Sequence, residues 1–258
     1  VDAGEITEML ADESAGRLTI VDQVITVNSA ATISVDTANL LDATTTGVVT
    51  ASITTTETVS ELNTLTGTNG AYTIVVASGD ATSTTAAQLN TLNGKTTVAV
   101  NLSNVTALAG SNLADLGTLA TAIGNSEFSN ATELTTIAVT DTTVDATALA
   151  ARIDSYDTIN GGSATTGMTL ASGATINVDA SEITAMLTDE GADRFTITDQ
   201  NITVTGEISV EDANKLNATT TGTITATIEQ SSVASLTTLT GTNAYTITIS
   251  DLEGLLPS

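Results

Sequence analysis

Residues 58–76 read TVSELNTLTGTNGAYTIVV, and residues 85–101 give the same pattern as TAAQLNTLNGKTTVAVN. Each stretch begins with Thr and carries Glu or Gln three residues later, the capping box that satisfies free N–H groups at a helix start. Apolar residues then recur at helical spacing, as Val59, Leu62 and Leu65 do, until a Gly ends the helix. The alternating run that follows predicts a strand. The stretch therefore predicts a short helix, a glycine turn and a strand.

This unit recurs along the chain. Further copies begin at Asp2, Ser34, Asp179, Ser209 and Ser232, and Glu5 and Glu182 follow the two aspartates at the capping-box position. Helices of two or three turns are too short to be stable alone. A strand, a short helix and a second strand at this spacing form a right-handed crossover that makes neighbouring strands parallel. The units are therefore expected to bury their apolar faces against one another.

A longer repeat contains the short one. Residues 1–25 read VDAGEITEMLADESAGRLTIVDQVI, and residues 178–202 read VDASEITAMLTDEGADRFTITDQNI. The match extends over residues 1–81 and 178–254, so we expect residues 1–258 to form one continuous repeat array. Because the chain starts with Val1 rather than Met, we expect a processed chain, a cut fragment or the ordered part of a longer protein.

The middle of the chain, residues 102–173, follows the pattern less regularly. It predicts helices over Asn130–Ile137 and Asp145–Ile153, and a loop or a change in coil shape from Gly161 to Gly173.

These patterns predict an α/β repeat fold, a right-handed solenoid of short parallel strands with short capped helices on one side. In its strands, residues such as Val49, Ala51 and Ile53 would face the core, and Thr50 and Ser52 would face away. The alternative is a parallel β-helix with few helical turns.

The charge of the chain excludes several function classes. It carries 30 acidic and 5 basic residues, a formal net charge of −25. A nucleic-acid backbone has almost nothing to pair with, an anionic membrane surface would repel the chain, and no apolar run is long enough to enter a membrane. Without Cys or His there is no disulfide, no thiol nucleophile and no histidine base. We therefore expect no enzyme; an enzyme on a solenoid scaffold, such as a polysaccharide lyase, would need a base that the sequence does not offer.

Four recurring aspartates are the candidate metal ligands. Asp12 and Asp189 stand in acidic pairs, each followed by an arginine, Arg17 or Arg194. They could form a carboxylate site, but we favour solvated loops with local ion pairs. Asp22 and Asp199 lie in Asp-Gln turns that we place between short strands. They could bind Ca²⁺, the one cofactor these residues point to, although turn chemistry alone also explains an Asp there.

Threonine rows are a further surface feature, at Thr223, Thr225 and Thr227 and at Thr246 and Thr248. Stacked on parallel strands they could form a flat ladder that binds ice. The simpler interpretation is that β-branched Thr suits an exposed strand face.

Three phrases, LNTLTGTNGAYTI at residues 62–74, LNTLNGKTTVAVN at residues 89–101 and LNATTTGTITATI at residues 216–228, resemble the Thr-rich repeats of giant cell-surface proteins of marine unicellular cyanobacteria. That group includes the very large surface protein associated with swimming without flagella. The resemblance covers most of the chain, about residues 33–102 and 145–251. It implies an extracellular structural or adhesive role in a long array, and it carries over no catalytic residue.

The sequence therefore predicts a non-enzymatic structural module of an extracellular or cell-surface sheath, array or filament. Its partners would be copies of itself or adjacent repeats, stacked head to tail. The alternative is a binding module: an adhesin, a calcium-dependent protein or an ice-binding protein.

Overall fold

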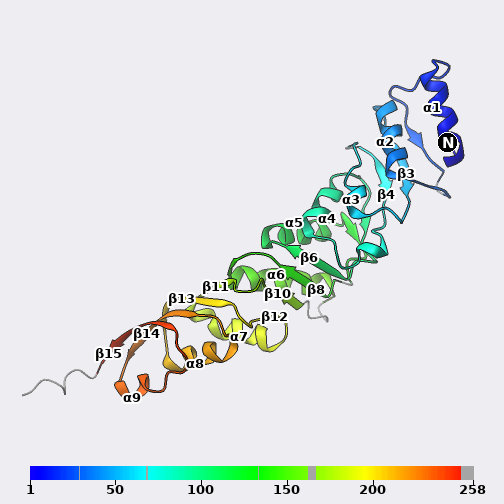
Figure 1. Cartoon of the computed structure of the whole chain (residues 1–258). Coiled ribbons are helices and arrows are strands. Elements are labelled where there is room, and N and C mark those ends of the chain that lie inside the picture. The colour runs from blue at the N-terminus through cyan, green and yellow to red at the C-terminus, as the bar shows by residue number, and fades with distance from the viewer. Residues whose placement is uncertain (29, 68, 133, 162–166, 251–258) are drawn as a thin grey trace, which may run out of the picture. The chain divides into compact units, whose positions relative to one another are not determined.

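The computed structural model of the chain describes residues 1–28, 30–67, 69–132, 134–161 and 167–250. The chain divides into two compact units, Val1–Thr136 with Thr158–Gly162, and Ile137–Asp157 with Ser163–Ser258. Figure 1 labels their helices and strands, and each unit is described by itself.

The first unit alternates short helices with short strands. In chain order its elements are η1 (Ala3–Glu5), α1 (Ile6–Ser14), β1 (Ile25–Thr26), β2 (Thr32–Ile33), α2 (Val35–Thr44), β3 (Val49–Ile53), α3 (Val59–Leu62), β4 (Ala71–Thr73), η2 (Ser78–Asp80), α4 (Ala86–Asn93), β5 (Val100–Asn101), β6 (Ala107–Ser111), α5 (Leu113–Gly124) and β7 (Phe128–Ser129). Strands β1 and β2 both pair with β3, β3 pairs with β4, and β5 pairs with β7, all in parallel.

The second unit has the same alternation. Its elements are β8 (Thr136–Val139), β9 (Thr143–Asp145), α6 (Ala146–Ile159), β10 (Gly167–Thr169), β11 (Thr175–Asp179), η3 (Ala180–Glu182), α7 (Ile183–Gly191), β12 (Phe195–Thr196), β13 (Asn201–Ile208), α8 (Val210–Thr219), β14 (Ile224–Ser231), α9 (Val233–Leu236) and β15 (Ala244–Ile249). Three residues of these elements belong to the first unit: Thr136, which begins β8, and Thr158 and Ile159, which end α6.

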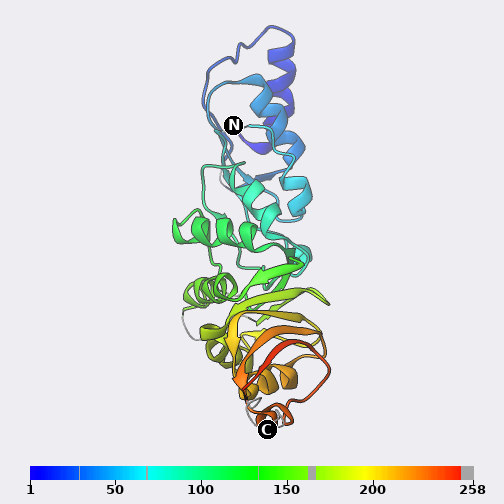
Figure 2. The ribbon, with the colours of Figure 1, turned by 90° about the vertical axis from the view of Figure 1, so that its left-hand side faces the viewer.

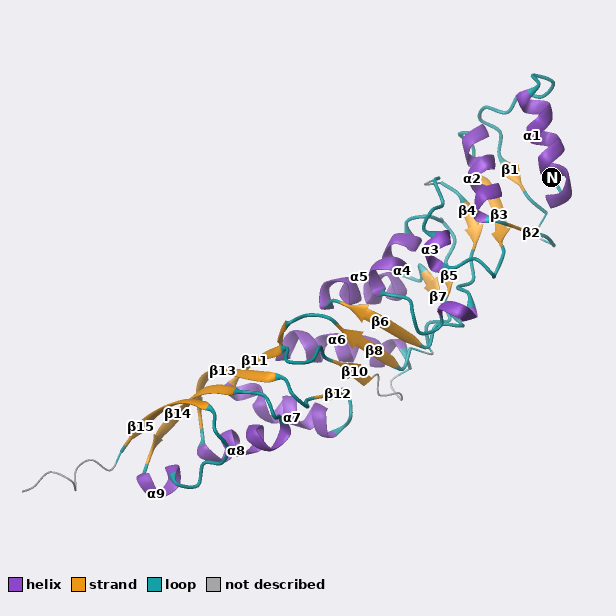
Figure 3. Ribbon diagram, in the orientation of Figure 1, coloured by secondary structure: helices purple, strands orange, loops and turns teal. Residues whose placement is uncertain are grey.

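Neighbouring strands of the main sheet in the second unit are parallel and follow chain order. The order is β9, β11, β13, β14 and β15, and β10 pairs in parallel with β12. In Figure 2 the later strands of this sheet, coloured yellow to red, lie side by side. Figure 3 shows α7, α8 and α9 on one side of them. The fold is therefore α/β with parallel strands in several sheets, as the sequence predicts at this level.

The helix starts form as their residue types predict. The Thr58 hydroxyl accepts the Glu61 N–H at 3.2 Å, and the Glu61 carboxylate accepts the Thr58 N–H at 2.7 Å. That backbone hydrogen bond, helped by the Thr58 hydroxyl, lowers the pKa of Glu61. Thr85 and Gln88 form the same capping box, and Ser34, Ser209 and Ser232 cap α2, α8 and α9.

One expected capping box does not form. Asp179 accepts the Ser181 N–H at 2.9 Å, and Glu182 instead accepts the Thr147 hydroxyl of α6 at 2.7 Å. The Glu182 carboxylate therefore links two helices instead of closing its own helix start.

The core consists mainly of aliphatic side chains from most of the strands and helices. Along β3, Val49, Ala51 and Ile53 are buried, and Thr50 and Ser52 are half-buried between them, as expected. The buried faces of α3 and α4 contribute Val59 and Leu62, and Ala86, Leu89 and Leu92, respectively.

Two predictions for the middle of the chain have different outcomes. The helix over Asp145–Ile153 is confirmed by α6, but the helix over Asn130–Ile137 is wrong. Asn130 has a positive φ of 56°, whereas the N-cap of a helix normally has an extended backbone, and Ile137 lies in β8, where β-branched residues favour a strand. Glu133 lies outside the described residues. In the segment from Gly161 to Gly173, residues 167–169 form β10, and residues 162–166 lie outside the described residues.

Candidate functional site

The recurring acidic pairs lie at helix ends rather than in loops. Asp12 is on α1 and Asp189 is on α7. Asp12 forms an ion pair with Arg17, and Asp189 forms one with Arg194 at 2.6 Å between Oδ1 and Nη1. The expected ion pairs are therefore present, and the expected loops were wrong because the helices continue through both aspartates.

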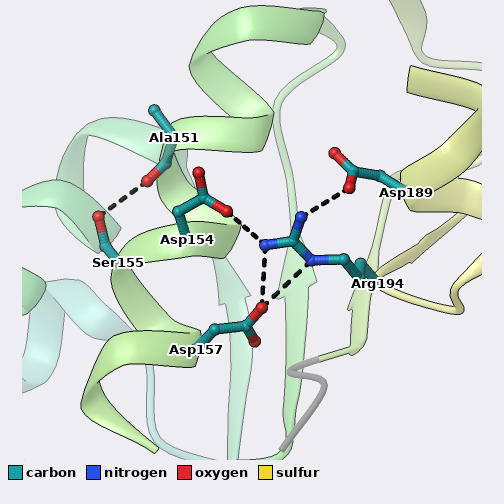
Figure 4. Close-up of polar contacts among 6 residues, drawn as sticks. All are labelled: Ala151, Asp154, Ser155, Asp157, Asp189 and Arg194. Carbon is teal, nitrogen blue, oxygen red and sulfur yellow. Dashed lines mark hydrogen bonds and ion pairs between the residues drawn. The ribbon is translucent and has the colours of Figure 1, made fainter. Parts of the chain in front are cut away.

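Arg194 is the centre of the largest charged cluster among the described residues (Figure 4). Its guanidinium donates to Asp157 Oδ2 from Nε at 3.2 Å and from Nη2 at 2.9 Å, and Nη2 also donates to Asp154. Asp154 and Asp157 are on α6, and Asp189 is on α7. One cation therefore holds two neighbouring helices of the second unit together.

Burial and hydrogen bonding act in opposite directions on Arg194. Burial lowers its pKa, but hydrogen bonds to Asp154, Asp189 and Asp157 outweigh it, so the pKa is raised above its ordinary value. The guanidinium stays charged at any physiological pH. Three carboxylates around one guanidinium carry a local net charge of −2, which suits a structural clamp better than acid–base catalysis, where one carboxyl must give up or take a proton.

Sequence reasoning missed Asp154 and Asp157. The signal was present in the Asp-x-x-Asp spacing, because residues three apart lie on the same face of a helix. The partner Arg194 is 37 residues beyond Asp157, so the local sequence alone could not pair them.

Asp22 and Asp199 belong to two matching turn networks. Asp199 lies between β12 and β13 as expected, whereas no strand precedes Asp22 after α1. The Gln23 amide donates to Asp22 at 2.9 Å, and Gln200 donates to Asp199 at 2.9 Å. The Gln23 and Gln200 side-chain oxygens accept backbone N–H groups of the same turns. These contacts give each recurring aspartate a structural role.

Asp199 has a further partner. The Ser172 hydroxyl donates to its second oxygen and is the main reason that the pKa of Asp199 is lowered, with the Gly173 N–H adding to the effect. Among the described residues, no group of three or more Asp, Glu, His or Cys side chains is arranged to hold a metal ion.

A pair of threonines connects each of these turns to the following one. Thr45 donates its hydroxyl to Gln23 O at 2.6 Å and accepts the Gly47 N–H at 2.9 Å, and the Thr46 N–H donates to Val21 O at 2.8 Å. We name this arrangement the Thr–Thr staple. Sequence reasoning noticed the matching ATTTG stretches at residues 43–47 and 218–222 only as a repeat and missed their role.

Within the described part of the chain, the Thr–Thr staple occurs three times. In the second unit, Thr220 donates to Gln200 O at 2.6 Å and the Thr221 N–H donates to Thr198 O at 2.9 Å. In the first unit, Thr96 donates to Tyr72 O at 2.7 Å and the Thr97 N–H donates to Gly70 O at 3.0 Å. The same contact between consecutive turns is therefore built by the same residue type in both units.

Two asparagines connect consecutive helical segments in the same repeated way. Asn39 donates to Thr64 O at 3.1 Å and accepts the Thr66 N–H at 2.9 Å. Asn214 donates to Thr238 O at 2.9 Å and accepts the Thr240 N–H at 2.8 Å. These side chains therefore join one helical segment to the next.

The threonine rows are short. Thr225 of β14 lies beside Thr203 of β13 on one side and beside Ala244 on the other. Thr227 lies between Glu207 and Thr246. Each row therefore places two threonines side by side before another residue type interrupts it.

No protein-family model matches the chain, and neither does any curated protein or solved structure. Within the part of the chain that the structure describes, no helix combines the length and apolar character needed to cross a membrane.

Proposed function

We propose that the chain is a non-enzymatic structural repeat module of an extracellular or cell-surface assembly. Its units stack as a right-handed solenoid, and its function is to build rigid length with an acidic surface. The observation that carries this proposal is the Thr–Thr staple at Thr45, Thr96 and Thr220, because it is a contact of one repeat with the preceding one and recurs with the same geometry. Contacts of this kind are what stabilise repeat arrays, in which each unit touches only its neighbours.

The contacts of other polar side chains, among them the recurring aspartates, also support a structural role. Asp189 and Arg194 hold helices together, Asp22 and Asp199 shape turns, and Asn39 and Asn214 connect helical segments. Each is used in a contact that orders a repeat or joins two repeats.

The charge of −25 fits this role. Repulsion between like charges would keep neighbouring stacked arrays apart. It would also keep exposed strand edges from pairing with other chains. The partners in this proposal are copies of the chain or adjacent repeats, stacked head to tail. Their strands would extend the sheet in parallel.

The proposal is tested by labelling the source cells with antibodies raised against the folded chain. Immunogold on intact cells should decorate the outer surface or material attached to it. Labelling that requires permeabilised cells would contradict the proposal. An antibody against a cytoplasmic protein of the same cells is the control for cell integrity.

A further inference from the structure

Equivalent residues of the two units differ sharply in burial. Val59 of α3 is 1% exposed, whereas its repeat counterpart Val233 of α9 is 46% exposed. Ile74, which follows β4, is 1% exposed, whereas its counterpart Ile247 of β15 is 44% exposed. The strand registers confirm the equivalence, because Tyr72 lies opposite Ala51 and Tyr245 lies opposite Ala226.

Exposed and half-buried apolar residues of this end of the second unit form a set that we name the β15 face. It comprises the apolar side chains of α9 and β15 and the turn between them, namely Val233, Leu236, Leu239, Tyr245, Ile247 and Ile249. Their counterparts Val59, Leu62, Leu65, Tyr72, Ile74 and Val76 are all buried in the first unit. The same apolar pattern is therefore buried in the first unit, whereas in the second unit its residues are exposed or half-buried.

The first unit shows what covers such a face. Residues 78–104 follow it and contribute the buried Ala86, Leu89 and Leu92 of α4. Along the strand, the Asn101 N–H donates to Ile74 O at 2.9 Å, and the Val76 N–H donates to Asn101 O at 3.1 Å. The cover therefore continues both the apolar core and the parallel strand pairing.

Three further polar contacts join the same segment to the preceding repeat. Asp80 accepts the Val59 N–H at 2.8 Å, and Lys95 donates to Leu65 O at 2.7 Å. The Asn63 amide donates to Gln88 O at 3.1 Å. These polar contacts fix the register of the cover on the preceding repeat.

The charge of the two surfaces also matches. From Ser231 to Ser250 the chain has no charged residue, although the whole chain carries −25. Residues 78–104 contain one acidic residue, Asp80, and one basic residue, Lys95. A neutral cover can therefore approach the β15 face without the repulsion that most of this acidic surface would impose.

We propose that the β15 face is the docking surface for a repeat of the class that residues 78–104 exemplify. The partner is a short capped helix with the pattern Ala-x-x-Leu-x-x-Leu, a following Lys-Thr-Thr turn and a strand that adds to β15 in parallel. This inference rests on the proposed stacking function and specifies one of its joints.

The experiment extends the chain with its own cover. Residues 78–125 are appended directly after Ser250, so that the added copies of Leu89 and Leu92 follow the β15 face as they follow Leu62 and Leu65 in the first unit. Hydrogen exchange of the β15 amides is compared with that of the unextended chain. We expect exchange at Tyr245, Ile247 and Ile249 to slow at least about tenfold, since these amides would lie inside a continued sheet.

Two variants control for non-specific effects of the extension. Leu89→Asp with Leu92→Asp, placed only in the appended copy, should abolish the protection and leave the original α4 intact. Val233→Asp with Ile247→Asp in the extended chain should do the same from the other side. Both variants change exposed or added residues, so the fold of residues 1–231 should persist.

Unchanged exchange at Tyr245 and Ile247 in the extended chain, whether or not the added segment is helical, would overturn the proposal. Protection of β15 in the unextended chain that rises with protein concentration would also overturn it, because the occupant would then be a second copy. Neither result changes the cell-surface labelling, so failure of this inference is distinguishable from failure of the proposed function.

Discussion

Arg17 and Arg194 occupy equivalent repeat positions but have different surroundings. The side chain of Arg194 is 20% exposed and contacts three aspartates, whereas that of Arg17 is 70% exposed and pairs with Asp12 alone. The difference comes from α6, which supplies Asp154 and Asp157 to Arg194. The same sequence motif is thus a clamp between helices at one site and a local surface pair at the other.

Arg194→Met should lower the free energy of unfolding by about 2 kcal/mol, because it leaves partly buried Asp157 and Asp189 without their charged donor. Arg17→Met is the matched control and should change it by less than about 0.5 kcal/mol, as exposed pairs contribute little. Urea unfolding of both variants measures this. Added salt should partly restore the Arg194 variant by screening the aspartates. Equal losses in the two variants would show that Arg194 is no clamp.

Tyr72 should make the protein sensitive to alkaline pH. Burial, with a smaller contribution from Asp42, raises the pKa of Tyr72 from 10.0 to about 12. A raised folded-state pKa stabilises the fold below the unfolded pKa, and this stability is lost as pH rises through the folded pKa. Unfolding free energy should therefore fall between pH about 10 and 12. Chemical unfolding across this range measures the loss.

The control is Tyr72→Phe, which removes the ionisable group. The Tyr72 hydroxyl is buried without a hydrogen-bond partner among the described residues, so its removal should also stabilise the protein by about 1 kcal/mol at neutral pH. Tyr245→Phe should give no such gain, because the Tyr245 hydroxyl accepts a hydrogen bond from Asn243 at 3.2 Å. An alkaline fall of the same size in Tyr72→Phe would refute the assignment to Tyr72.

Gly222→Ala should destabilise the second unit by about 1–3 kcal/mol, because a Cβ at this position would overlap the Gln200 carbonyl of the preceding turn. Gly47→Ala should do the same in the first unit, where the Gln23 carbonyl lies equally close. Thermal unfolding measures both. Gly124→Ala is the control, since its Cβ would meet no other atom within 4 Å and Ala favours a helix. A neutral Gly222→Ala would mean that the turns do not touch as described.

Removal of calcium should leave the melting temperature unchanged. Arginines pair with Asp12 and Asp189, and glutamine amides donate to Asp22 and Asp199. An ion that bound the folded chain alone would raise the melting temperature by mass action. Melting in EDTA is compared with melting in millimolar Ca²⁺, for the parent chain and for Asp199→Asn. A calcium-dependent rise that Asp199→Asn removes would assign a calcium site to that turn instead.

The parts of the fold that the sequence predicts are those determined locally. The starts of α3 and α4 follow from Thr58 with Glu61 and from Thr85 with Gln88, because a capping box is complete within four residues. The helix predicted from Asn130 does not form because this residue has a left-handed backbone conformation. The residues around it resemble a helix cap and do not reveal that conformation. Asp154 and Asp157 escape prediction because their partner Arg194 comes from a different turn of the chain.

Removal of one whole repeat tests most directly whether the chain is a stack of equivalent repeats. Deleting residues 58–84 joins Glu57 to Thr85, so that Leu89 and Leu92 take the places of Leu62 and Leu65 on the preceding repeat. The control deletes residues 58–70, which removes α3 but keeps β4. This partial deletion breaks the register between consecutive repeats. Far-UV circular dichroism and urea unfolding are measured for both. If the protein is a stack of equivalent repeats, the whole-repeat deletion keeps its signal per residue and unfolds cooperatively, whereas the control loses structure. Loss of structure in the whole-repeat deletion to the same extent as in the control would contradict the account.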